Sequence, residues 1–141
     1  FLDILMADEF FNIKPPKSLD RNYFNKYLKS NEVAPKDLVS TLSYFTASAI
    51  VHALEYLPKN ISKIIICGGG SKNKYIIDKI SELSKKDVII SDDIGMNSKY
   101  IEAEAFAYLA VRCLLNLDIS YPTTTGVQTA ISGGSIFRPI D

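Results

Sequence analysis

Two short apolar runs joined by an amphipathic segment constrain the fold of this chain more than any other feature. Residues 63–67 (KIIIC) and 87–91 (DVIIS) are rich in β-branched side chains, as is typical of buried strands. Residues 73–85, between them, repeat apolar side chains at helical spacing. Because parallel strands need a long crossover connection, this order predicts two parallel strands joined by a helix.

Helical patterns lie on both sides of this unit. Residues 35–57 carry an apolar stripe of helical period, and shorter helices are predicted over 1–13 and 19–30. A long helix is predicted over 98–117, with its first residue as the N-cap. The segment ISGGSIFRPI near the C-terminus is predicted to form a short strand. The order of elements indicates an α/β fold, a small and mainly parallel sheet flanked by helices.

Composition narrows the classes of partner. The 141 residues contain 16 Lys and Arg against 16 Asp and Glu, which does not favour a nucleic-acid partner, because binding phosphates asks for a basic face. No apolar run approaches the ~20 residues of a membrane-spanning helix. Cys67 and Cys113 lie in apolar runs without metal-ligand spacing, so we expect two buried thiols. The chain does not begin with methionine, and we expect it to be an internal or C-terminal piece of a longer protein.

Three consecutive glycines, Gly68, Gly69 and Gly70, separate the first predicted strand from the helix that follows. Glycines allow the backbone to approach a ligand closely, and the start of a helix offers free N–H groups. Ser71 and Asn73 add polar groups there. The pattern is neither G-x-G-x-x-G nor a Walker loop, so two interpretations stay open: a tight turn without a ligand, or a contact with a nucleotide or phosphate. Its place at the carboxyl end of a parallel strand favours the ligand.

Acidic residues on the same side of the predicted sheet are the other candidates. Glu102 lies in register with the apolar stripe of the last long helix, where it could aim at a ligand or simply complement the helix dipole. Glu104 points elsewhere and is predicted to be a surface acid. Asp92 and Asp93 follow the second strand and could order their loop or approach a metal, with the first role favoured. The single histidine, His52, is predicted to be structural.

Five segments, taken together and in order, give a more specific picture. They are PPKSLDRNYFN (15–25), CGGGSKN (67–73), IEAEAFAYLAVRCL (101–114), PTTTGV (122–127) and GGSIFRP (133–139). In this order they resemble the C-terminal part of the anhydro-N-acetylmuramic acid kinase family. The resemblance covers essentially the whole chain, and the PPKS and CGGG blocks are its most specific parts.

The resemblance implies a fold and a division of the chain. The family belongs to the sugar kinase, Hsp70 and actin superfamily, in which two RNase H-like domains close around ATP. Residues 1–141 would then form a single partial domain, the C-terminal lobe of an actin-like ATPase, with a helical segment over 1–60 and a nucleotide-binding α/β part over 61–141. The first strands of that lobe would lie upstream, so the sheet should lack its centre and expose an edge.

The resemblance also implies site residues. Gly68, Gly69, Gly70 and Asn73 would lie on the ATP side of the cleft. Glu102 would face the sugar, since it matches the glutamate of the family's M-E-A-x-A-F-A helix. Lys17 and Arg21 belong to the conspicuous PPKS block, but the sequence assigns them no chemical role.

The implied reaction is the phosphorylation of 1,6-anhydro-N-acetylmuramic acid by ATP and Mg²⁺, with opening of the anhydro ring, to give N-acetylmuramic acid 6-phosphate. The implied setting is peptidoglycan recycling in the cytoplasm, with a homodimer as a possible assembly. The family's general-base aspartate and its N-terminal lobe are expected upstream, so the chain alone should not catalyse the reaction.

This sequence also departs from the family pattern. Where relatives usually carry G-[IV]-x-G-D-D-M-E, the chain reads GMNSKYIE, with Lys99 and Tyr100 in place of two acids. A second interpretation therefore stays open, a catalytically inactive remnant of the kinase that at most binds a nucleotide.

Overall fold

The computed structural model describes residues 1–29 and 33–138 of the chain. Its α-helices are α1 (Leu2–Met6), α2 (Asn25–Leu28), α3 (Pro35–Ala53), α4 (Lys74–Ser84), α5 (Ile101–Leu114) and α6 (Pro122–Thr125). Its strands are β1 (Lys63–Ile66) and β2 (Asp87–Ile90), and its 3-10 helices are η1 (Glu9–Asn12), η2 (Leu54–Tyr56), η3 (Gly69–Lys72) and η4 (Ser91–Ile94).

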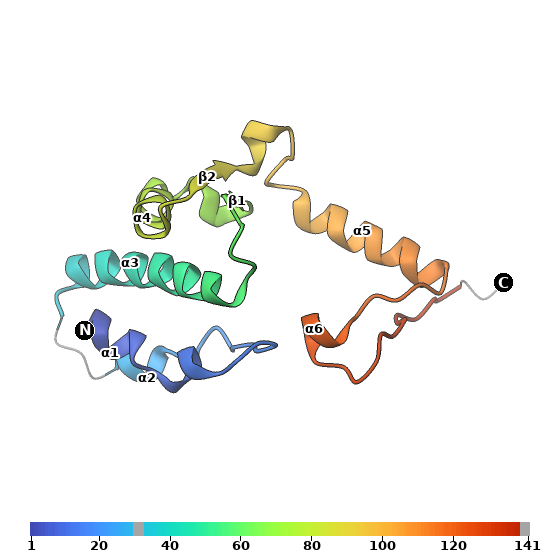
Figure 1. Ribbon diagram of the computed structural model, residues 1–141, viewed down its shortest axis with the longest axis horizontal. Helices are drawn as coiled ribbons and strands as arrows, with labels where there is room; N and C mark the ends of the chain where they lie inside the picture. The colour runs from blue at the N-terminus through green and yellow to red at the C-terminus, as the bar shows by residue number, and fades with distance from the viewer. Residues whose placement is uncertain (30–32, 139–141) are drawn as a thin grey trace.

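The predicted strand–helix–strand unit is present. Strands β1 and β2 pair in parallel, from Lys63 opposite Asp87 to Ile66 opposite Ile90, and α4 forms the crossover. Helix α4 packs on α3 (Figure 1), and its Ile80 is fully buried. The α/β fold with a small parallel sheet is therefore confirmed.

The prediction that both strands are buried on both faces is wrong. Along β1 the side chains alternate between exposed and half-buried, and the side chain of Ile65 is 51% exposed. The helix that packs against the sheet covers one face, so the alternate residues of an apolar run project from the other. The continuous apolar run identified a strand but not what covers it.

Helix α3 forms as expected because Pro35 occupies its first turn and its apolar stripe meets the N-terminal segment. Phe45 of α3 packs with Leu5 and Phe11 in the main apolar core, and the ring of Phe24 lies 4.9 Å from that of Phe45. The core of the described residues thus lies between α3 and the first 27 or so residues, away from the two strands.

Asp8 organises this N-terminal segment and explains why two predicted helices are shorter than expected. Its buried carboxylate accepts hydrogen bonds from the hydroxyls of Tyr23 (3.0 Å) and Tyr27 (2.6 Å) and from the N–H of Phe10 (2.9 Å), and pairs with Lys26 at 2.8 Å. The helix predicted over 1–13 is therefore divided into α1 and η1 on either side of Asp8. The helix predicted over 19–30 is reduced to α2 within the described residues, since residues 21–24 form turns.

Helix α5 begins at Ile101 and not at Ser98, because the N–H of Ser98 donates to the Asp92 carboxylate, 3.2 Å away, and residues 98–100 form a turn. The helix extends away from the sheet and has no buried residue (Figure 1). Phe106, on the predicted inward stripe, is 64% exposed.

The segment after α5 is irregular apart from α6. The predicted terminal strand is absent from residues 131–138, which show a single antiparallel bridge, Ser120 to Ile131. The last residues of the predicted strand, 139–140, lie outside the described part.

Both cysteines are free, but Cys67 is exposed and Cys113 half-buried, so the prediction of two buried thiols is wrong. In the described ranges no helix has the length and apolarity to cross a membrane.

Candidate functional site

The glycine turn connects β1 to α4 and has a defined shape. Gly68 has a φ of +76°, a conformation that side chains disfavour, so glycine is required there. Ser71 is buried, and its hydroxyl donates to the carbonyl of Gly68 at 2.7 Å. The Ser71 hydroxyl therefore stabilises the turn. The expectation that it adds a polar group for a ligand at the start of the helix is wrong.

Gly69 and Gly70 have a different property. A Cβ atom added at either position would meet no atom of the protein within 4 Å, and neither has a positive φ. Packing against the described residues does not require glycine at these two positions. The turn therefore leaves open space of the kind that a ligand would occupy at the carboxyl end of β1.

Asn73 is the N-cap of α4, with its side-chain oxygen 3.3 Å from the N–H of Ile76. The cap uses the side-chain oxygen, and the same side chain carries an amide nitrogen that can donate. An α-helix of this length also leaves the N–H groups of its first turn without intrahelical partners. The arrangement suits a negatively charged ligand.

The second loop follows β2 and lies at the same end of the sheet as the glycine turn, because β1 and β2 are parallel. Hydrogen bonds from the side chain and the N–H of Ser98 hold the pKa of Asp92 below its usual value against a small opposing effect of burial, and the charge of Lys72 acts in the same direction. Lys72 is the last residue of the glycine turn. Asp92 orders its loop, as predicted, while Asp93 is exposed.

Glu102 lies in the first turn of α5, directly after this second loop, and is exposed. Glu102 therefore lies on the side of the sheet where the glycine turn lies. Among the described residues, no contact is recorded between its carboxylate and that turn. Its role toward a sugar stays a prediction. Glu104 is exposed on the same helical turn, in agreement with the interpretation as a surface acid.

Ser91, the first residue after β2, is a feature that the sequence did not reveal. Its side chain is fully buried, and its hydroxyl has no hydrogen-bond partner among the described residues.

We expect Ser91→Ala to leave the free energy of unfolding unchanged or to raise it by about 1 kcal/mol, because an unpaired buried hydroxyl carries a desolvation cost. Chemical denaturation measures this, with Ser71→Ala as the matched control; that variant should be destabilised because it loses a hydrogen bond. A loss of more than about 1 kcal/mol in Ser91→Ala would show that the hydroxyl has a partner.

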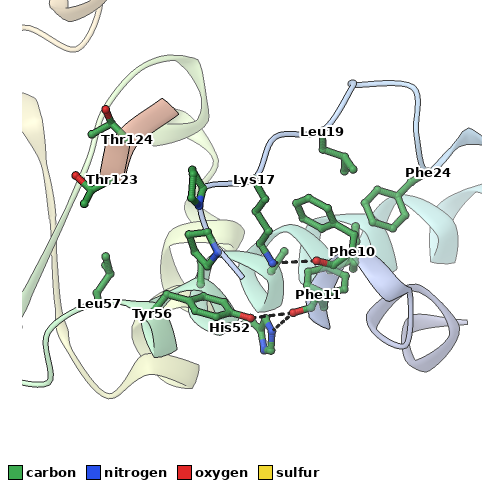
Figure 2. A pocket seen from close by; sticks show the side chains of 15 residues that line it. Phe10, Phe11, Lys17, Leu19, Phe24, His52, Tyr56, Leu57, Thr123 and Thr124 are labelled. Atoms are coloured by element: carbon green, nitrogen blue, oxygen red, sulfur yellow. Dashed lines mark hydrogen bonds between the residues drawn. The ribbon is translucent and has the colours of Figure 1, made fainter. Parts of the chain in front are cut away.

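A cavity of about 590 Å³ lies elsewhere, between the N-terminal segment, α3 and α6 (Figure 2). The glycine turn does not line it. Its walls are mainly apolar. They include Lys17, whose ammonium donates to the carbonyl of Phe10 at 2.9 Å and lies over the rings of Phe10 and Tyr56. Of its polar side chains, Lys17, His52, Tyr56 and Thr124 already have hydrogen-bond partners within the described residues.

His52 lines the same cavity and is structural, as the sequence predicted. Its Nε2 lies 3.2 Å from the carbonyl oxygen of Phe11, and its ring packs edge-on against the ring of Phe11. Arg21 is exposed, and the structure assigns it no role. Over the described ranges, no three His, Cys, Asp or Glu side chains gather in a group that could hold a metal ion.

A parallel strand–helix–strand unit with a glycine turn at the helix start is typical of α/β domains that bind phosphate-containing ligands. Comparison with known proteins makes this specific. The chain belongs to the anhydro-N-acetylmuramic acid kinase family, whose model matches residues 1–139.

Curated relatives agree with this assignment. Proteins named anhydro-N-acetylmuramic acid kinase from Methylorubrum populi, Zymomonas mobilis and Bradyrhizobium diazoefficiens are 39%, 40% and 43% identical to the chain over 98%, 96% and 92% of its length. The aligned region covers 36%, 37% and 35% of those relatives, so the chain spans little more than a third of their length.

Proposed function

We propose that this chain is the nucleotide-binding lobe of an ATP-dependent kinase that acts on 1,6-anhydro-N-acetylmuramic acid. The observation that carries the proposal is the family match over 1–139, which includes the strand, the glycine turn and the helix described above. In the reaction, water opens the anhydro ring and the γ-phosphoryl group of ATP passes to the freed 6-oxygen, giving N-acetylmuramic acid 6-phosphate and ADP. The setting is the recycling of peptidoglycan amino sugars, and the use of ATP suits a cytoplasmic location.

The glycine turn fits ATP. Gly68 gives the turn its left-handed conformation, and Gly69 and Gly70 leave room for a phosphate group to approach the backbone. The first turn of α4 and the amide nitrogen of Asn73 offer N–H donors to the phosphate oxygens. These four residues would bind and orient the nucleotide.

Glu102 would bind the sugar from the start of α5. Its carboxylate accepts hydrogen bonds, and sugar hydroxyls donate them. The general base is not among the residues proposed here and would come from another part of the protein, together with the second lobe that closes the cleft. Phosphoryl transfer depends mainly on positioning and charge stabilisation in a closed site, so residues 1–141 alone should not catalyse it.

Mg²⁺ is part of the proposal as a cofactor of ATP. Mg²⁺ in kinases is usually held by substrate phosphates and one or two carboxylates, not by a cage of protein ligands. Asp92 and Asp93 of the second loop are both exposed, but Asp92 accepts a hydrogen bond from Ser98, so we propose that Asp93 is the residue that could approach Mg²⁺. A homodimer also stays a proposal.

Substitution of Gly69 tests the ATP assignment. We expect Gly69→Val to weaken ATP binding at least tenfold, because its side chain would fill the space left for the phosphates, and Gly69→Ala to have a smaller effect. ATP at 100 times its Kd would stabilise the unsubstituted protein by about 2.7 kcal/mol, and a tenfold loss of affinity removes about 1.4 kcal/mol of that. The melting temperature with and without ATP measures both.

The melting temperature without ATP is the control in this experiment. It should not change, because a Cβ at position 69 has open space around it. If the unsubstituted protein and Gly69→Val gain the same stability from ATP, the nucleotide does not bind at this turn. If neither protein gains stability from ATP, the result would favour the alternative, a catalytically inactive remnant of the kinase that at most binds a nucleotide.

A further inference from the structure

Two of the sequence blocks that characterise the chain meet far from the glycine turn. The loop that contains Pro16, Lys17 and Ser18 lies against α6, where Thr124 and Thr125 line a small cavity with it. A Cβ atom added to Gly126, at the end of α6, would lie 3.2 Å from Cγ of Pro16. The PPKS and PTTTGV blocks are therefore contact partners, which their positions about a hundred residues apart do not reveal.

The first link of this contact ties the PPKS loop to the N-terminal core. Lys17 donates to the carbonyl of Phe10 at 2.9 Å, and its ammonium lies 4.5 Å from the centre of the Phe10 ring and 5.0 Å from that of Tyr56. Phe10 itself packs against the buried core residue Phe11. Lys17 thus fixes the loop to the most tightly packed part of the described chain.

The second link ties α6 to α5. The guanidinium of Arg112 donates to the carbonyl of Asp118 at 2.6 Å, to the hydroxyl of Tyr121 at 3.2 Å and to the hydroxyl of Tyr108 at 3.0 Å. Tyr121 is the N-cap residue of α6, and Tyr108 belongs to α5. One side chain therefore holds the last turn of α5, the connecting segment and the start of α6 together.

Helix α5 needs such a support. None of its residues is buried, and it makes no extensive contact with another helix or strand of the described part. At its first turn it is connected to β2 through the η4 loop, and at its last turn it is held by Arg112 (Figure 1). A rise of 1.5 Å per residue places Glu102 about 15 Å from Arg112 along the helix axis, so a small change of tilt at one end displaces the other.

We propose that the PPKS loop and α6 form a strut that sets the orientation of α5, and that Lys17 and Arg112 are positioning residues for Glu102. The strut consists of links in series: core to loop through Lys17, loop to α6 through the Pro16–Gly126 contact, and α6 to α5 through Arg112. The kinetic part of the proposal rests on the proposed function, whereas the structural part does not.

A distance measurement tests the strut without relying on activity. In the protein expressed from the complete reading frame that contains this chain, spin labels are attached at two exposed positions, Ser81 on α4 and Glu104 on α5, after replacement of the other cysteines. We expect one narrow distance distribution in the parent, and a broadened or shifted one in Lys17→Met and in Arg112→Met. The matched controls are Lys14→Met and Arg138→Met, which remove a cation of the same kind at exposed positions outside the strut.

The double variant gives the sharpest result. Because links in series fail together, Lys17→Met with Arg112→Met should change the distance distribution no more than either single variant does. Lys17→Arg should behave like the parent, since it keeps a cation over the two rings. Unchanged distributions in both single variants, or effects that add in the double variant, would overturn the strut.

Kinetics in the same variants test the positioning role. We expect kcat/KM for the anhydro sugar to fall roughly 10- to 100-fold in Lys17→Met and Arg112→Met, since a displacement of about 1 Å of a positioning group can cost that much. The KM for ATP should stay within about twofold, because the glycine turn is carried by β1 and α4. An equal fall of kcat/KM for the anhydro sugar and for ATP would contradict the positioning role. A parent protein without kinase activity would instead contradict the proposed function, and the distances would still decide on the strut.

Discussion

Glu102→Gln should reduce phosphorylation of the anhydro sugar about 100-fold or more. The substitution keeps the size of the side chain but removes the charge with which it would hold the sugar hydroxyls in a reactive position. Because Glu102 is exposed and forms no part of the core, the melting temperature should not change. Steady-state kinetics with varied sugar and with varied ATP would measure the effect. The kcat/KM for the sugar should fall, and the KM for ATP should not change.

Glu104→Gln is the matched control for this prediction. Both glutamates lie in the first turn of α5 and both are exposed, but two positions along a helix point about 200° apart. Glu104→Gln should therefore retain the activity of the parent. If the two variants lose activity equally, the effect comes from the charge of the helix start and not from a contact between Glu102 and the sugar.

Asp8→Asn should destabilise the chain by about 3 kcal/mol. The Asp8 carboxylate accepts from two tyrosine hydroxyls and one N–H and pairs with Lys26, and an amide cannot replace both acceptor oxygens or the charge. Denaturant unfolding measures the loss. Asp3→Asn is the control, since Asp3 is exposed on α1, and it should stay within about 0.5 kcal/mol of the parent.

The same carboxylate predicts a pH dependence. Burial alone would raise the pKa of Asp8, but Lys26, Tyr27, the N–H of Phe10 and Tyr23 together hold it well below the ordinary value. A lowered pKa in the folded state means that the stabilisation is fully present above about pH 4, where an unfolded Asp is ionised, and is lost as the pH falls below that value. The stability difference between the parent and Asp8→Asn should therefore shrink under acidic conditions. A difference that is constant down to pH 2 would show that charge is not its origin.

The spacing of apolar residues along the sequence was sufficient to predict the strand–helix–strand unit. The runs 63–67 and 87–91 and the amphipathic residues between them predicted two parallel strands and a crossover, and the structure confirms the pairing. These elements follow from periodicity, which is a property of neighbouring residues. Helix α3 was predicted on the same grounds.

Elements that depend on contacts distant in sequence were not predicted. The network around Asp8 joins residues up to 19 positions apart and shortens two helices that periodicity alone would extend. The start of α5 shifts to Ile101 because Ser98 bonds to Asp92. The contact between the PPKS loop and α6 is of the same kind, and the burial of Ser91 without a partner has no signal in the sequence.

Among the site residues, the sequence predicted positions better than contacts. Gly68, Gly69, Gly70 and Asn73 do lie between β1 and α4, and Asn73 caps that helix. Glu102 does lie in the first turn of α5. The ligand that each of these residues contacts is part of the proposed function.

The most direct test of the account is a kinase assay on the protein expressed from the complete reading frame that contains this chain. The protein is incubated with ATP, Mg²⁺ and 1,6-anhydro-N-acetylmuramic acid, and the products are identified by mass spectrometry. The account predicts N-acetylmuramic acid 6-phosphate and ADP in equal amounts, and no turnover by residues 1–141 alone. An absence of phosphorylated sugar with the complete protein would contradict the proposed kinase.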